Sequence, residues 1–503
     1  MKFNKFWSLL PVELCLIFVS FHYRTPGTRQ YVSNFENVLG TSFELKVSSE
    51  SESAADLAEN RALEEIDRMA KILSAYDSSS EFSRWMMTYN RPVKISVELF
   101  QVLALFDQWR ARTGGALDAS AEVVSRVWKK ASRQNLLPGK DELQSAIELV
   151  KQQHWVLDPQ HQTATRLSEA PLMLNSFVKS YIISAVADTL SRVPGIHAVM
   201  VNIGGDMVVR GDLKEKIRIS DPKADAENDR PVDVINIQDM AVATSGNYRR
   251  GFSVQGKWYS HIVDPRTGMP ASEIISSTVI SKKATDAGAM ATAFNILSID
   301  ESRKLAASIP GTEYLIITRQ GTSYASEGWT AMESGQALHA DQGITLPIKQ
   351  QQNAFELQID IELAQFEGRF RRPFVAIWVE NSNKEPVRNL ALWFNKPRWL
   401  PDLKEWYRTN YQNELNAGSN AATISSATRP PGKYTIKWDM KDDKGVAVKP
   451  GTYTVYIEAA REHGTYQLMK QEIVCRKKDQ NIGISGNTEI SSASLTYRKA
   501  GGN

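Results

Sequence analysis

The chain has few cysteines, no apolar run of membrane-spanning length and almost no excess of one charge. Its 503 residues include two cysteines, Cys15 and Cys475. If the N-terminal segment is removed, Cys475 alone remains, which excludes an intrachain disulfide and any multi-cysteine metal site. The 60 Lys and Arg residues against 57 Asp and Glu give a net charge of +3. Without a broad positive field, the protein is not expected to bind nucleic acid.

The N-terminal residues 1–27 have the layout of an export signal. Lysines precede an apolar run over residues 6–21, and polar residues follow it. A proline and a glutamate interrupt this run, which is shorter than the ~20 residues of a membrane-spanning helix. The segment predicts an exported protein, in the periplasm or at the outer face of the inner membrane. The signal is either cleaved or kept as a membrane anchor, and a buried N-terminal helix is the alternative.

Length and pattern predict two folded domains. The first, over residues 30–330, mixes helices and strands. Apolar residues recur at helical spacing over 56–75, and a second helical stretch covers 96–111. Residues 197–211 read as a strand, a glycine break and a second strand. The first domain is therefore predicted to be α+β.

The remainder of the chain changes character. Residues 331–354 are polar and aperiodic, as in a linker. Residues 355–477 alternate apolar and polar side chains between short turns, which predicts an all-β, immunoglobulin-like sandwich. Residues 478–503 are rich in Ser, Gly and Lys and are predicted to be disordered.

Polar side chains capable of chemistry are densest over residues 243–271. The turn Ser245-Gly246-Asn247 offers backbone N–H groups and a hydroxyl, Arg249 and Arg250 add cationic donors, and His261 precedes a rigid turn. Such a set suits a pyrophosphate. Each of these residues alone is equally typical of an ordinary turn or surface, so the inference depends on the combination.

Six segments, in order, resemble the ApbE-type FAD:protein FMN transferase family over residues 35–325. They are VLGTSFELKV (38–47), LSAYDSSSEFSRW (73–85), TGGALDAS (113–120), VNIGGDMVVRG (201–211), ATSGNYRR (243–250) and YSHIVDPRTGMP (259–270). The resemblance implies an enzyme that binds FAD and, with Mg²⁺, transfers the FMN portion to a Thr or Ser of an acceptor protein, releasing AMP.

Carried over position by position, the resemblance also implies a set of site residues. The implied nucleotide-binding residues are Glu81, Lys179, Gly204, Gly205, Asp206, Ser245, Gly246, Tyr248 and Arg249. The implied catalytic residues are His261, beside the phosphates, and Thr292.

The sequence departs from the family at the metal site, where the family has an A-D-A-L-x-T helix. Thr292 is present, but the position four before it is Gly288 instead of an acid. Asp286 lies six residues before Thr292, about 120° away around a helix. Asp286 and Thr292 are the expected metal ligands, on the condition that the helix begins after Asp286.

A second departure affects the family's D-L-x-G-I-A-K-G segment, which reads LMLNSFVKSY (172–181) here. Lys179 is kept, whereas Met173 replaces the acid and serines at 176 and 180 replace glycines. Mg²⁺ prefers anionic oxygen ligands, so these changes weaken the metal site. The alternative function is therefore a catalytically impaired flavin-binding pseudoenzyme that acts as an interaction module in an envelope redox system.

Residues 355–475 resemble a bacterial periplasmic domain of unknown function, and fold analogy assigns it no activity. Within it, ATISSATR (422–429) resembles the D-x-x-S-G-A-T sequence that such transferases modify, with Thr428 at the acceptor position. Ala422 and Ser426 replace the acid and the glycine, so an ordinary Ser/Thr loop is the favoured interpretation and weak self-modification the alternative.

Overall fold

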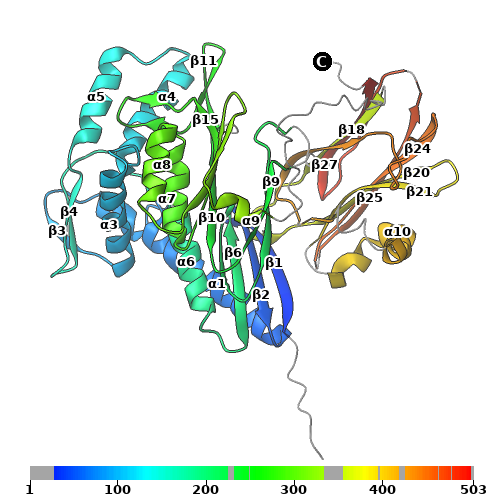
Figure 1. The fold of residues 1–503 in the computed structure, drawn as a ribbon, viewed down its shortest axis with the longest axis horizontal. Coiled ribbons are helices and arrows are strands. Elements are labelled where there is room, and N and C mark those ends of the chain that lie inside the picture. Colours follow the sequence, from blue (N-terminus) through cyan, green and yellow to red (C-terminus); the bar gives the residue numbers. More distant parts are fainter. Residues whose placement is uncertain are drawn as a thin grey trace, which may run out of the picture.

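The structure is a computed structural model that describes residues 28–224, 231–247, 250–333, 355–394, 397–417, 425–426, 428–462, 464–476 and 478–499. They form an N-terminal domain (28–333) and a C-terminal domain (355–499), which lie side by side in Figure 1. The predicted signal or anchor at 1–27 lies outside the described residues, as does nearly all of the predicted linker at 331–354. Among the helices that the structure describes, none has the length and apolar character needed to cross a membrane.

A nine-stranded antiparallel sheet forms the framework of the N-terminal domain. In spatial order its strands are β17 (Ser323–Ala325), β16 (Glu313–Thr318), β15 (Ile274–Ser281), β10 (Ala241–Gly246), β7 (Asp206–Gly211), β6 (Ile196–Ile203), β2 (Thr41–Ser49), β1 (Arg29–Val38) and β19 (Phe370–Arg371). Side chains alternate between the two faces, as in β2, where Phe43, Leu45 and Val47 are buried. The strand, glycine turn and strand predicted at 197–211 are confirmed as β6 and β7.

Helices cover one face of this sheet. They are α1 (Glu52–Leu73), α2 (Glu81–Met86), α3 (Val97–Arg112), α4 (Glu122–Gln134), α5 (Lys140–Lys151), α6 (Val178–Leu190), α7 (Ala284–Phe294) and α8 (Ile299–Ala307). Of these, α1, α6 and α7 pack directly on the strands, whereas α4 and α5 lie farther out (Figure 1). The helices predicted at 56–75 and 96–111 are confirmed as α1 and α3, because their apolar residues recur on the buried face.

The opposite face of the sheet is covered by a hairpin and a short helix. The hairpin consists of β8 (Glu215–Ile219) and β9 (Asp233–Ile237), and the helix is α9 (Trp329–Met332). The other small elements of the domain are β3 (Pro92–Lys94), η1 (Ala119–Ala121), β4 (Trp155–Asp158), β5 (Thr163–Arg166), β11 (Gly251–Val254), β12 (Lys257–Ser260), β13 (Val263–Asp264) and β14 (Met269–Pro270). Ile235 and Ile237 of β9 and Trp329 of α9 are buried against this face. The Trp329 indole also donates a hydrogen bond to Asp233 Oδ2 at 2.7 Å.

The C-terminal domain is all-β apart from one helical insertion. One sheet has the order β23 (Gly432–Trp438), β18 (Phe355–Leu363), β27 (Ile490–Lys499), β26 (Gln480–Ile484). The other has the order β22 (Ser425–Ser426), β21 (Pro386–Trp393), β20 (Phe374–Asn381), β24 (Gly451–Ala460), β25 (Tyr466–Cys475), with η2 (Pro397–Asp402) and α10 (Lys404–Ala417) packed on its outer side. Leu357 and Leu495 of one sheet and Ile377 of the other share a single core. The predicted all-β character of this domain is confirmed.

The prediction of a disordered tail at 478–503 is wrong for the described part of that segment. Residues 480–484 and 490–499 form β26 and β27, and β27 pairs along the whole length of β18. Ala493, Leu495 and Tyr497 alternate along β27 and are buried, so alternate residues hold this polar sequence in the core.

Candidate functional site

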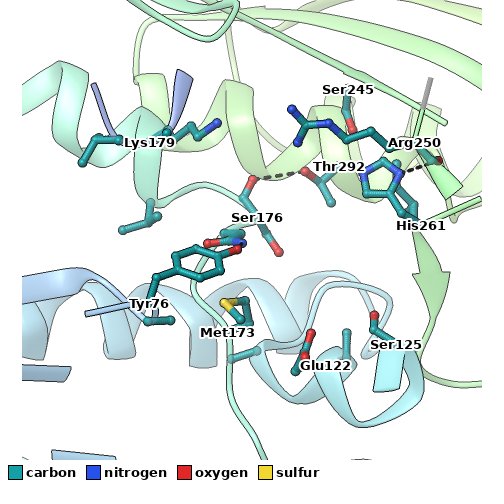
Figure 2. Close-up of a pocket in the computed structure, with 18 of the residues that line it drawn as sticks. Tyr76, Glu122, Ser125, Met173, Ser176, Lys179, Ser245, Arg250, His261 and Thr292 are labelled. Atoms are coloured by element: carbon teal, nitrogen blue, oxygen red, sulfur yellow. Dashed lines mark hydrogen bonds between the residues drawn. The ribbon is translucent and has the colours of Figure 1, made fainter. Parts of the chain in front are cut away.

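A cavity of about 1170 Å³ lies in the N-terminal domain, between α1, η1, α6, α7 and the loops that follow β10 and β12. Binding sites for small molecules usually enclose ~300–1,000 Å³, so this cavity has room for a dinucleotide. The predicted site residues Lys179, Ser245, His261 and Thr292 line it, together with Arg250. Figure 2 shows these side chains converging on one space from three separate segments of the chain.

The imidazole of His261 is oriented by the backbone of Arg250. Its Nδ1 lies 3.1 Å from the Arg250 carbonyl oxygen, and the His261 amide donates to the same oxygen at 3.2 Å. A carbonyl can only accept, so Nδ1 carries the proton and Nε2 is left as a proton acceptor. Although the residue keeps an exposed edge, desolvation of the ring lowers the pKa of His261. The imidazole therefore stays neutral to a lower pH than that of an ordinary histidine, whose pKa is 6.5.

Lys179, on α6, brings its ammonium group against the glycine turn between β6 and β7. An added Cβ at Gly204 would lie 3.4 Å from the Lys179 Nζ and 2.9 Å from side-chain atoms of Thr41. Gly204 also has a φ of 65°, so this position requires glycine for both space and backbone conformation. Burial lowers the pKa of Lys179, with Asp206 opposing that shift and Arg250 adding to it. The side chains of Lys179 and Arg250 extend toward each other in Figure 2 and form a cationic wall of the cavity.

Asp206 supports this wall from outside the cavity lining. Its Oδ2 accepts a hydrogen bond of 3.0 Å from the Ser180 hydroxyl. Burial raises the pKa of Asp206 to about 6, against the opposing effects of that hydrogen bond and of Lys179. Asp206 therefore acts on the ammonium of Lys179 and does not face the cavity itself.

Gly288 and Ser180 occupy one shared space between α7 and α6. A Cβ added at Gly288 would lie 2.1 Å from the Ser180 Oγ and 3.0 Å from its Cβ. Both distances are far below ordinary van der Waals contact, so α7 approaches α6 this closely only because position 288 is glycine. The two departures from the family sequence are thus complementary in space, a relation that the sequence alone does not show.

Thr292 faces the cavity, whereas Asp286 does not. The Thr292 hydroxyl donates to the carbonyl oxygen of Ser176 at 3.1 Å, which joins α7 to the loop before α6. Helix α7 begins at Ala284, before Asp286, so Asp286 and Thr292 project about 120° apart. The structure does not bring together the two residues expected to bind the metal, because the condition of a later helix start is not met.

Three other predicted site residues, Glu81, Gly205 and Gly246, are not among the residues that line the cavity. The Glu81 carboxylate accepts a hydrogen bond of 2.6 Å from the Ser96 amide, which fixes the start of α3. Gly246 ends β10 and is paired with Ser276 of β15. Gly205 continues the glycine turn with a φ of 99° and is not among the cavity-lining residues. Tyr248 and Arg249 lie outside the described residues.

Other cavity-lining residues were not predicted as site residues. They include Tyr76, Glu122, Ser125, Asn175 and Arg369. The Tyr76 ring is largely exposed, and its hydroxyl accepts a hydrogen bond of 2.7 Å from the Asn175 amide. Tyr76 lies within a segment that the family resemblance had identified, so that resemblance could have indicated it. Nothing in the sequence indicates Arg369, which comes from the C-terminal domain.

Comparison with known proteins gives a family for each domain. The ApbE family matches residues 39–316, and a family described as Predicted periplasmic protein (DUF2271) matches residues 356–492. An FAD:protein FMN transferase of Vibrio cholerae is 28% identical over 279 residues, which cover 53% of this chain and 82% of the relative. One of Haemophilus influenzae is 29% identical over 300 residues, covering 56% and 84%.

Solved structures share the fold of the N-terminal domain. The crystal structure of the ApbE protein of Thermotoga maritima superimposes with a TM-score of 0.54 at 25% identity, covering 61% of this chain and 99% of that one. The N-terminal domain thus has the fold of that ApbE protein.

Proposed function

This chain belongs to the ApbE family, and from that premise we propose that it transfers the FMN portion of FAD to a Thr or Ser hydroxyl of an acceptor protein. The observation that supports this function most is the cationic wall of the cavity. Lys179 and Arg250 line a space large enough for FAD, and His261 lines the same space with a neutral imidazole. Cations of this kind suit a pyrophosphate, whose charge they offset.

The reaction that we propose is a displacement at phosphorus. The acceptor hydroxyl oxygen attacks the phosphorus that carries the riboflavin portion, and the bond from this phosphorus to the bridging oxygen of AMP breaks. The hydroxyl proton passes to Nε2 of His261, which the hydrogen bond at Nδ1 leaves unprotonated. Lys179 and Arg250 stabilise the charge that develops on the phosphate oxygens.

The residues present do not fit the Mg²⁺ that the family resemblance implies. Thr292 Oγ1 and the Ser176 carbonyl supply two neutral oxygens, but position 288 is glycine and Ser180 fills the space beside it. In the part of the chain that the structure describes, no three His, Cys, Asp or Glu side chains form a group that could hold a metal ion. Mg²⁺ prefers carboxylate ligands, so we derive no step through it.

The lack of a carboxylate at position 288 favours a second candidate function. A protein that kept the cavity and the cationic wall but lost a metal-binding carboxylate would hold flavin nucleotide without turning it over. Under this proposal the C-terminal domain makes the chain an interaction module. The Gly288–Ser180 contact favours this candidate, and the neutral His261 favours the transferase.

We test the two candidates with the purified protein, FAD and a standard acceptor domain, in MgCl₂ or in EDTA. Binding is followed by flavin fluorescence and transfer by the mass of the acceptor. An FMN-sized mass increase that is lost in His261→Ala supports the transferase. The matched control is His197→Ala, because His197 pairs with Glu50 at 2.9 Å outside the cavity lining. Binding without a mass increase supports the second candidate, and no binding refutes both.

We also propose that the protein is exported. The C-terminal family is described as periplasmic, and residues 1–27 have the composition of a signal or anchor. Whether this segment is cleaved or attaches the protein to the membrane stays a prediction, as does the immunoglobulin-like connectivity of the C-terminal domain.

Self-modification at Thr428 is not part of this proposal. Thr428 is 1% exposed, and its carbonyl oxygen accepts a hydrogen bond of 2.7 Å from Arg372. The Thr428 side chain is therefore buried, which does not support self-modification, the alternative interpretation of residues 422–429.

A further inference from the structure

The C-terminal domain reaches the cavity through one short segment, residues 365–372. The Asn37 side chain, near the end of β1, donates to the carbonyl oxygens of Gly368 at 2.6 Å and Phe366 at 3.3 Å. Strand β19 then pairs with β1 and extends the sheet of the N-terminal domain. This segment is therefore held by backbone and side-chain contacts to the domain that contains the site.

Arginines of this segment pair with acids of the N-terminal domain. Arg371 lies 2.9 Å from Glu59, and its guanidinium is also stacked 4.7 Å from the centre of the Phe35 ring. Arg372 pairs with Glu36, and both side chains are almost fully buried. A buried charge left without its partner is strongly unfavourable, so these pairs fix the segment in one position.

Arg369 is the arginine of this segment that lines the cavity. Its guanidinium donates to Asp67 Oδ1 of α1 at 2.7 Å, and Asp67 also lines the cavity. The adjoining wall is apolar, because Ile66, Ala70 and Leu73 follow one another along one face of α1 and all three line the cavity. This end of the cavity therefore combines apolar sides with a charged donor and a charged acceptor.

This combination suits the edge of a flat heterocycle. The apolar wall can pack against the face of a ring, while Arg369 and Asp67 offer N–H donors and a carboxylate acceptor to its edge. Both ring systems of FAD present such an edge, since the flavin carries an O=C–N–H–C=O unit and adenine an amino group beside ring nitrogens.

We propose that Arg369 is a binding residue for a heterocyclic ring of the nucleotide, so that the C-terminal domain completes the nucleotide site. The inference rests on the proposed function. It assigns to the C-terminal domain a direct part in recognition of the nucleotide, in addition to any partner that the domain binds.

The test uses the full chain with the variants Arg369→Met and Arg369→Lys. Arg388→Met is the matched control, because Arg388 pairs with Asp443 within the C-terminal domain and does not line the cavity. Dissociation constants for FAD, FMN and ADP are measured by equilibrium dialysis. The melting temperature without ligand shows that each variant is folded.

Loss of one charged hydrogen-bond donor is expected to weaken FAD binding about tenfold in Arg369→Met. Arg369→Lys keeps the charge but not the planar group, so a smaller loss is expected. If Arg369→Met also weakens FMN binding but not ADP binding, Arg369 binds the flavin. If it weakens ADP binding but not FMN binding, Arg369 binds adenine.

Equal affinity for FAD in Arg369→Met and the unaltered protein would overturn the inference. Equal losses in Arg369→Met and Arg388→Met would overturn it too, because an effect unrelated to the cavity would then account for both losses. Failure of the unaltered protein to bind FAD would instead refute the proposed function.

Discussion

A methyl group added at position 288 is expected to destabilise the N-terminal domain, and removal of the Ser180 side chain is expected to reverse the effect. In Gly288→Ala the new Cβ would lie 2.1 Å from the Ser180 Oγ, so the hydroxyl must rotate away. That rotation breaks its hydrogen bond to Asp206. Overpacking of this kind costs about 1–3 kcal/mol, and a lost hydrogen bond adds about 1 kcal/mol.

The opposing effect is helix propensity, because alanine is favoured over glycine within a helix by about 1 kcal/mol. Position 288 is inside α7, so this gain remains in both backgrounds. In the Ser180→Gly background the clash is absent, and Gly288→Ala should stabilise the domain. The two substitutions are therefore expected to couple by about 2–4 kcal/mol in a double-mutant cycle, which is the overpacking together with the lost hydrogen bond.

The cycle is measured by urea unfolding, followed by far-UV circular dichroism, for the unaltered protein, the two single variants and the double variant. Independent sites add within about 0.5 kcal/mol. A coupling energy below that value would refute the reasoning, because Gly288 and Ser180 would then not share one space.

The same geometry changes what a restored carboxylate can do. Gly288→Asp alone places its side chain against Ser180 and is expected to bind no Mg²⁺. With Ser180→Gly as well, the carboxylate lies four residues before Thr292 on one helix face, so the double variant is expected to gain Mg²⁺ affinity by calorimetry. Equal Mg²⁺ binding by Gly288→Asp with and without Ser180→Gly would contradict this account.

Three further perturbations have defined outcomes. Desolvation lowers the pKa of His261 from its usual 6.5, so the unfolded state binds a proton at this residue before the folded state does as the pH falls. The free energy of unfolding should therefore decrease as the pH falls below about 6.5, and His261→Ala should weaken this dependence on pH. Arg372→Met leaves Glu36 buried without its partner and should cost about 3–5 kcal/mol, measured by urea unfolding against Arg388→Met as control. Burial raises the pKa of Cys475 to about 12, so iodoacetamide at pH 8 should label this residue only after unfolding. Labelling is located by peptide mass mapping, and rapid labelling of Cys475 in the native protein would contradict its buried position.

Local patterns predicted much of the fold. Helix α1 follows from the spacing of Ala62, Ile66 and Leu73, and β18 follows from the alternation of Leu357 and Ile359, because burial of one face dictates these periods. The disordered tail was predicted wrongly because polar composition outweighed an alternating pattern that becomes stable only when β27 pairs with β18.

The site was predicted less completely than the fold. Motif resemblance indicated Lys179, His261 and Thr292, each of which lines the cavity. It could not indicate that Ser180 fills the space beside Gly288, since that contact depends on the packing of two helices that are distant in the sequence. Arg369 was missed for the same physical reason, because only tertiary structure brings the C-terminal domain to the cavity.

The pairing of β19 with β1 also constrains the order in which the chain can fold. Strand β1, at Arg29–Val38, is the first strand of the described chain, yet one of its neighbours is β19, at Phe370–Arg371. Contacts so far apart in sequence form slowly, because a long loop must close before they stabilise anything. During synthesis, Phe35 and Glu36 of β1 would therefore lack their strand partners until residues 370 and 371 arrive, and this short stretch of the sheet edge is open to pairing with another chain until then.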